Sequence, residues 1–143
     1  KDGTPNAKDQ LTWKWAAGAT TPKLDFGQPT TTDGYQLCVY DGAGLQLSAV
    51  VPPGGTCANG KPCWKEKTKG FDYKDKDLTP DGISQLKLQE GLVAGKAQIQ
   101  IKGKGTALDD PTMPLAQPVI LPYISAMQAL GSMPRASACP WSR

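Results

Sequence analysis

Apolar and polar residues alternate along Tyr35–Gly55, and this stretch predicts a β-hairpin around which the rest of the chain is organised. Tyr35, Leu37 and Val39 fall on one face of its first strand. The turn is predicted at residues 41–44 because glycine tolerates the positive φ that tight hairpin turns require. Prolines and glycines at 52–55 end the second strand.

The same two-residue period predicts the other strands, each with one face in contact with solvent. They are expected at 11–17, 71–74, 83–89, 95–102 and, as an edge strand, 117–124. Residues 56–69 are interpreted as a loop with a lysine-rich continuation, and 125–130 as a short helical turn. We therefore expect one all-β domain spanning 1–143, with a loose lead-in at 1–10 and a tail at 131–143. Its predicted fold is an antiparallel immunoglobulin-like β-sandwich of about seven to eight short strands.

Composition agrees with this architecture and limits the partners and surroundings to be expected. Among 143 residues, 16 glycines and 13 prolines disfavour long helices. The formal charge of +3 is spread along the sequence, so we expect no nucleic-acid partner. No apolar run is long enough to predict a membrane span. Because the chain starts at Lys1 without an apolar leader, it is expected to be a mature or excised piece.

Histidine is absent from the sequence. This excludes every catalytic arrangement and metal site that requires an imidazole. The 13 acidic residues offer no carboxylate pair that its sequence context singles out for hydrolysis. Asp72, Asp75, Asp77 and Asp81 do not have the spacing of an EF-hand loop and are expected to lie in an ordinary solvated turn. We expect a protein that is not an enzyme and that has no metal and no cofactor.

The four cysteines predict two disulfides. Cys57 and Cys63 flank a short loop with Asn-Gly at its centre, and their pairing leaves Cys38 to join Cys139. A four-thiolate zinc site is disfavoured because no two cysteines are two to four residues apart, and free thiols remain a further alternative. Disulfides indicate an oxidising compartment, so the protein is expected to be secreted, at the cell surface or periplasmic.

The order of several short motifs resembles an uncharacterised β-rich domain of secreted bacterial proteins. The matching stretches lie between about residues 8 and 124 and include W-K-W at 13–15, L-C-V-Y-D at 37–41, P-C-W-K at 62–65, Y-K-D-K at 73–76 and P-D-G at 80–82. The resemblance implies export and a β-rich fold. It implies no activity and therefore no catalytic residues.

Two of the four tryptophans and a group of lysines are the candidate ligand-binding residues, and the other two tryptophans are not. Trp13 and Trp15 share a strand face with Leu11 and are interpreted as core residues. Other aromatic and basic side chains are better placed to stack on sugars or meet an anionic surface. These candidates are Trp64, Trp141, Lys65, Lys67 and Lys69.

The first functional hypothesis is a non-catalytic extracellular structural or protein–protein interaction module, a subunit or repeat of a surface assembly. Its partners would be further copies of itself or other surface proteins, recruited by strand addition at 117–124. The alternative is a carbohydrate- or surface-binding module that uses exposed tryptophans and lysines, with a polysaccharide as its partner.

Overall fold

The computed structural model describes residues 1–143 apart from Asp2, Asp110, Thr112, 120–123 and 129–143. Its described part contains ten strands and three short 3-10 helices but no α-helix. The strands are β1 (Gln10–Gly18), β2 (Asp33–Asp41), β3 (Gly44–Val51), β4 (Thr56–Cys57), β5 (Lys61–Pro62), β6 (Trp64–Lys67), β7 (Gly70–Lys74), β8 (Ile83–Gln89), β9 (Ala97–Lys104) and β10 (Ile124–Gln128). The 3-10 helices are η1 (Asn6–Lys8), η2 (Lys23–Phe26) and η3 (Ala58–Gly60). No helix in the described part has the length and apolar composition needed to cross a bilayer.

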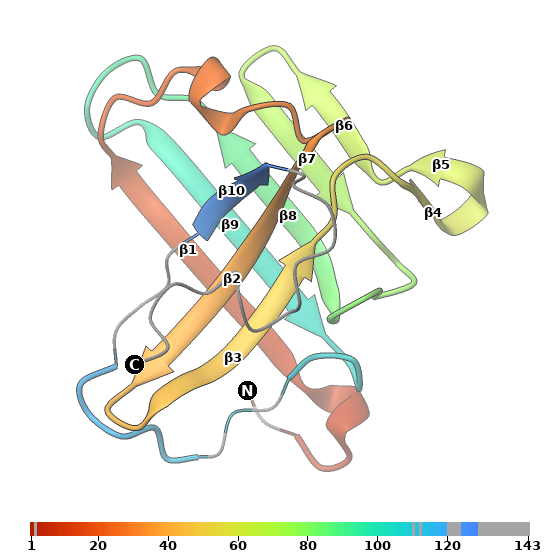
Figure 1. Ribbon diagram of the computed structural model, residues 1–143, viewed down its shortest axis with the longest axis vertical. Coiled ribbons are helices and arrows are strands. Elements are labelled where there is room, and N and C mark those ends of the chain that lie inside the picture. The colour runs from red at the N-terminus through yellow and green to blue at the C-terminus, as the bar shows by residue number, and fades with distance from the viewer. Residues whose placement is uncertain (2, 110, 112, 120–123, 129–143) are drawn as a thin grey trace.

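The strands form antiparallel sheets, as predicted. The larger sheet has the order β1-β9-β8-β7-β6, and a smaller sheet has the order β10-β2-β3. β4 and β5 form a separate two-stranded ribbon. In Figure 1, β2 and β3 lie across the strands of the larger sheet. The fold therefore has two layers.

One hydrophobic core joins the two sheets. The inward side chains of the larger sheet include Leu86 and Ile101, and those of the smaller sheet include Leu37 and Val51. All four are almost fully buried. Burial of apolar surface between two sheets is the main source of stability in such a fold. The opposite face of the larger sheet is left to solvent, and this face positions the candidate site.

The predicted central hairpin is confirmed, with Tyr35 opposite Val51 and Asp41 opposite Gly44. The expected wet face of its first strand is wrong, because β2 is buried on both faces. Gln36 is among these buried residues and donates from Nε2 to Ser48 Oγ at 2.7 Å. The segment at Ala116 covers one end of β2, where the Ala116 N–H donates to Asp41 Oδ2 at 2.9 Å.

Two local predictions need correction. Residues 64–67 were expected to be part of a loop but form strand β6 at the edge of the larger sheet. Residues 124–128 form strand β10, which pairs with β2, instead of the predicted helical turn. Pairing with an existing sheet satisfies backbone groups that a helical turn this short would leave open. Of the predicted edge strand at 117–124, residues 117–119 are not in a strand and 120–123 lie outside the described residues.

The predicted Cys57–Cys63 disulfide is present and closes the loop that contains η3. Its presence excludes the free-thiol and zinc alternatives for these two residues. Cys139 lies outside the described residues, so the pairing of Cys38 with Cys139 stays a prediction.

Replacing both Cys57 and Cys63 with serine is expected to lower the free energy of unfolding by about 2 kcal/mol. The loop that they close is short, and the entropy removed from the unfolded chain grows only slowly with loop length. Urea denaturation followed by circular dichroism measures the change. Ala58→Ser, which alters the same loop without touching the disulfide, is the control and should unfold at the wild-type urea concentration. An unchanged midpoint for the double variant would show that the bridge does not stabilise the fold.

Candidate functional site: a lysine-rich sheet face

The solvent face of the five-stranded sheet carries an array of lysines and glutamines. The register fixes which residues share this face, because side chains alternate along each strand and align across neighbouring strands. We call this surface the lysine face. It consists of Lys14, Lys65, Lys67, Lys74, Lys87, Lys102 and Lys104 together with Gln10, Gln85, Gln89, Gln98 and Gln100. All seven lysines are exposed.

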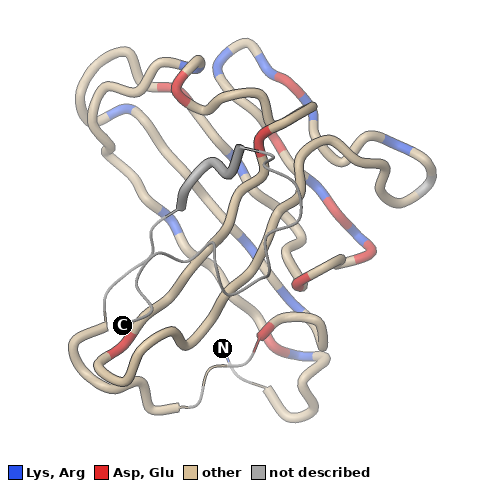
Figure 2. Tube along the Cα trace, viewed as in Figure 1, with Lys and Arg blue, Asp and Glu red and all other residues tan. Residues whose placement is uncertain are grey.

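Charge is strongly segregated onto this face. The five strands place seven lysines there and a single acid, Asp72, which gives the face a formal charge of +6. The whole chain has 16 basic and 13 acidic residues, so the remainder has nine basic and twelve acidic residues and a formal charge of −3. Figure 2 shows lysines along several neighbouring strands of the larger sheet. The modest net charge of the sequence therefore conceals a strongly basic surface.

The register keeps the lysines from facing one another directly. Gln100 lies between Lys14 and Lys87, which pair with it from the two neighbouring strands. The two lysines are therefore two strand spacings apart, about 10 Å. Lys102 has Thr12 on one side and Gln85 on the other. Like charges placed directly opposite in a sheet destabilise it. The interleaved glutamines let the sheet hold many positive charges without that penalty.

The acidic residues on and beside strands β6 and β7 mostly point away from the lysine face. Asp75 is buried, and its carboxylate accepts hydrogen bonds from the backbone N–H groups of Asp77 at 2.7 Å and Thr79 at 2.9 Å. Glu66 alternates to the other side of β6, where Lys23 Nζ lies 2.5 Å from its Oε1. Only Asp72 lies among the lysines, with Lys67 Nζ at 3.6 Å. The basic surface is therefore less neutralised than the linear sequence indicates.

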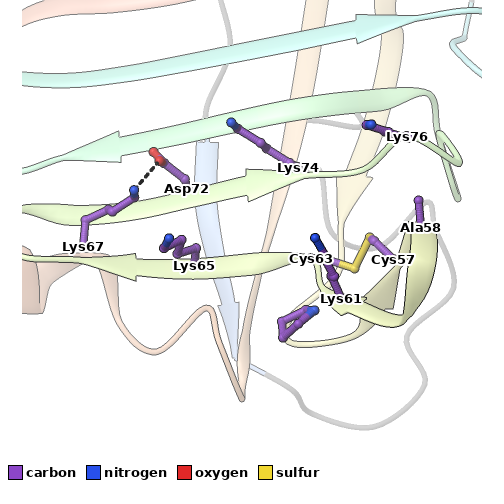
Figure 3. A pocket seen from close by; sticks show the side chains of 10 residues that line it. Cys57, Ala58, Lys61, Cys63, Lys65, Lys67, Asp72, Lys74 and Lys76 are labelled. Carbon is purple, nitrogen blue, oxygen red and sulfur yellow. Dashed lines mark ion pairs between the residues drawn. A yellow bond between two sulfur atoms is a disulfide. The ribbon is translucent and has the colours of Figure 1, made fainter.

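A concavity of about 380 Å³ adjoins the lysine face where β6 and β7 meet the disulfide-closed loop. We call it the basic concavity, and Figure 3 shows its lining. The charged side chains that line it are Lys61, Lys65, Lys67, Lys74, Lys76 and Asp72, and the Cys57–Cys63 disulfide lies at one end. The formal charge of this lining is +4.

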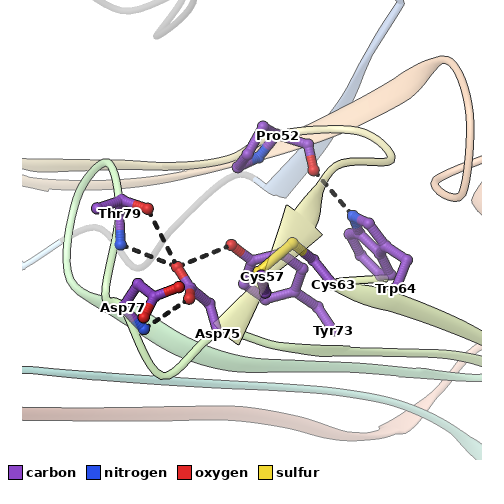
Figure 4. Close-up of a disulfide and its surroundings, with 8 residues drawn as sticks. All are labelled: Pro52, Cys57, Cys63, Trp64, Tyr73, Asp75, Asp77 and Thr79. Carbon is purple, nitrogen blue, oxygen red and sulfur yellow. Dashed lines mark hydrogen bonds between the residues drawn. A yellow bond between two sulfur atoms is a disulfide. The ribbon is translucent and has the colours of Figure 1, made fainter. Parts of the chain in front are cut away.

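Trp64 is not an exposed recognition residue, contrary to the sequence-based hypothesis. Its side chain is 4% exposed and packs between Tyr35 and Tyr73, with ring centroids 5.9 and 5.2 Å away. The indole Nε1–H donates to the carbonyl oxygen of Pro52 at 2.8 Å (Figure 4). Trp64 points inward because residues alternate along β6, which places Lys65 on the outer face.

Tyr73, which packs against Trp64, also contacts Asp75 in the turn after β7. Tyr73 Oη donates to Asp75 Oδ2 at 3.5 Å, and Figure 4 shows the two side chains pointing toward one another. Burial raises the pKa of the Tyr73 phenol, and the negative charge of Asp75 raises it further. Asp75 is thus a structural residue of the turn, not an exposed ligand. In the described part of the chain, no group of three or more acidic or cysteine side chains is placed to hold a metal ion.

The other predicted binding residues do not all lie in one place. Lys65 and Lys67 lie together in the basic concavity. Lys69 is exposed in the turn between β6 and β7, outside that lining, and Trp141 lies outside the described residues. The lysines of β1, β8 and β9 are functional candidates that sequence reasoning missed, although their alternation with apolar residues marks them as outward-facing.

No protein-family model, curated protein or solved structure matches this chain.

Proposed function

We propose that this chain is a non-catalytic extracellular binding module whose lysine face binds an acidic polysaccharide. The observation that carries the proposal is the concentration of seven lysines and one acid on a single sheet face. A positive surface attracts polyanions, releases their counterions and binds them more strongly as ionic strength falls. The bound polymer would lie along the sheet and contact several lysines at once.

Protection of sheet edges does not explain the array. Lysines on edge strands commonly deter edge-to-edge association, and this accounts for Lys14 on β1 and for the lysines of β6. However, Lys87 and Lys102 lie on β8 and β9, which are interior strands of the sheet. An ordinary solvated face would also mix both signs of charge. The separation of charge favours a ligand of opposite sign.

The chemistry of the lysine face favours a polysaccharide over other polyanions. Its outward strand positions contain no aromatic residue on which nucleic-acid bases could stack and no arginine for bidentate contacts with phosphate or guanine. Lysine is depleted in the cores of protein–protein interfaces. The glutamine amides, in contrast, can donate to and accept from sugar hydroxyls between the charged groups.

The compartment and the finer fold belong to the same proposal. The Cys57–Cys63 bridge supports a location outside the reducing cytosol. Two antiparallel sheets that share a core support a two-layered β-sandwich. The crossed sheets and the consecutive strands β6 to β9 differ from the aligned Greek-key order of an immunoglobulin-like domain, so that finer assignment stays a prediction. The second disulfide remains part of this prediction. Self-association by strand addition also stays a prediction, since residues 120–123 lie outside the described part of the chain.

Lys87→Glu is expected to weaken binding to an acidic polymer by about tenfold at low ionic strength. Lys87 lies on an interior strand of the lysine face, and the substitution changes the local charge by two units. Lys8→Glu makes the same change to net charge but lies in η1, outside the sheet, and is the matched control. Carboxymethyl-dextran and dextran sulfate are the ligands, with neutral dextran as the blank, and biolayer interferometry measures affinity.

The proposal requires that neutral dextran does not bind and that the two variants differ. Equal losses for Lys87→Glu and Lys8→Glu would show that only net charge matters and would contradict a defined binding face. Tighter binding to double-stranded DNA or to anionic lipid vesicles than to either acidic dextran would assign the face to a different class of partner.

A further inference from the structure

We infer that the basic concavity is a separate subsite for a sugar unit that carries more than one sulfate group. This inference rests on the proposed function, because it specifies the type of acidic polysaccharide that the module selects. The concavity is distinct from the rest of the lysine face. Two of its lysines, Lys61 and Lys76, lie outside the five-stranded sheet, and the ribbon β4–β5 adds a wall that the flat sheet does not have.

Most of the positive charge in the concavity is uncompensated. Asp72 lies near Lys67, and this is the only ion pair within the lining among the described residues. Lys61, Lys65, Lys74 and Lys76 make no ion pair in the described part of the chain. Several ammonium groups around one concavity repel each other, and a bound polyanion removes that repulsion.

The protein holds two of these lysines in place through their neighbours. Lys61 belongs to the loop closed by the Cys57–Cys63 disulfide. Lys76 follows Asp75, whose carboxylate is fixed by the backbone N–H groups of Asp77 and Thr79. A side chain whose backbone is already ordered loses less entropy on binding. The backbones of Lys61 and Lys76 are therefore preorganised, and Figure 3 shows both residues at the end of the concavity near the disulfide, away from Lys67.

The charge and size of the concavity select the ligand chemistry. Its volume of about 380 Å³ is near the lower end of the range for small-molecule sites, so it accommodates a sugar-sized unit, not a length of polymer. A formal charge of +4 favours a unit with several negative charges over a singly charged one. A uronic acid has one carboxylate per sugar, whereas sulfate esters can occupy several hydroxyls of the same sugar. The concavity thus matches a multiply sulfated unit.

The test uses sucrose octasulfate, which is much shorter than a polymer and can present one multiply sulfated sugar ring to the concavity, and carboxymethyl-dextran, which reports on the lysine face. Lys61→Gln/Lys76→Gln removes two lysines of the concavity that lie outside the sheet. Lys87→Gln/Lys102→Gln removes two lysines of the interior strands and the same total charge. We expect the first variant to lose about tenfold in affinity for sucrose octasulfate and less than about threefold for carboxymethyl-dextran. The second variant should lose about tenfold in affinity for carboxymethyl-dextran and less than about threefold for sucrose octasulfate.

Amide chemical shifts in a sulfate-sugar titration of the wild-type protein provide an independent readout. We expect the largest changes at 57–63 and 74–76. Equal losses in both variants for both ligands, or shifts spread evenly over the sheet, would overturn the subsite while leaving the proposed function intact. Binding of sucrose octasulfate that depends on Lys61 and Lys76, together with no binding of any acidic dextran, would confirm the anion subsite and refute the polymer-binding function.

Discussion

Replacing Trp64 with alanine is expected to destabilise the fold by about 3–5 kcal/mol, the largest effect that we predict for a single substitution. Removal of a fully buried indole loses its transfer free energy and leaves a cavity between Tyr35 and Tyr73. It also leaves the Pro52 carbonyl without the indole N–H that donates to it. Urea denaturation followed by far-ultraviolet circular dichroism measures the change without depending on tryptophan emission.

Trp15→Ala is the matched control for this experiment. Trp15 is not the core residue that the sequence predicts, because it lies on the edge strand β1 and is 36% exposed. Its removal should therefore cost less than half as much. Trp64→Phe keeps most of the ring packing but loses the N–H donor, and about 1 kcal/mol is expected for it. If Trp64→Ala were no more destabilising than Trp15→Ala, the burial of Trp64 would be wrong and its role as an exposed recognition residue would have to be reconsidered.

The alternation of side chains was sufficient to locate most of the sheet. β2, β3 and β9 have apolar residues at every second position over most of their length, as β8 has from Leu86 onward, and each was predicted close to its observed bounds. The turns between strands, that between β6 and β7 included, contain or adjoin glycines whose backbone the fold requires. Gly70, for example, has φ +146°, and a Cβ there would lie 1.9 Å from the Leu88 carbonyl oxygen on the neighbouring strand. Such local signals are visible in a sequence before any tertiary contact is known.

β6 was missed because one of its inward positions is charged. Glu66 lies opposite Phe71 on the inner side of the sheet, which hides the alternation that Trp64 begins. Its charge is tolerated there because β6 is an edge strand and Lys23 pairs with it from η2. That partner lies 43 residues away in sequence, so no local pattern could show it. The misplacement of Trp64 in the sequence analysis follows from the same cause.

The candidate site was only partly predictable for a similar reason. Each strand showed its own outward lysines, but strand order was needed to show that β1 lies beside β9 and that five strands share one surface. In the linear sequence, only lysines that are close together along the chain, such as Lys65, Lys67 and Lys69, form a visible group. Acids lie between such lysines in the sequence, but the structure directs Asp75 and Glu66 away from them. Charge segregation is a property of the assembled sheet.

The triple variant Lys14→Glu, Lys87→Glu, Lys102→Glu is expected to lose at least about 100-fold in affinity for acidic dextrans. Three lysines replaced by glutamates reduce the formal charge of the lysine face from +6 to zero. Each lysine near an anionic surface contributes about 1 kcal/mol, and each glutamate adds repulsion of similar size. The dependence of affinity on salt should weaken as well, since fewer counterions are released when the polymer binds.

The control for this variant replaces Lys1, Lys8 and Lys69 with glutamate. Both triple variants change the formal charge of the whole chain from +3 to −3, so their general repulsion from a polyanion is the same. They differ in where the charge is lost, because Lys1, Lys8 and Lys69 lie outside the strands of the larger sheet. We expect the control to keep most of its affinity and its salt dependence. Similar losses in the two variants would mean that binding follows net charge alone, and the ordered array of lysines on the sheet would then have no role in recognition.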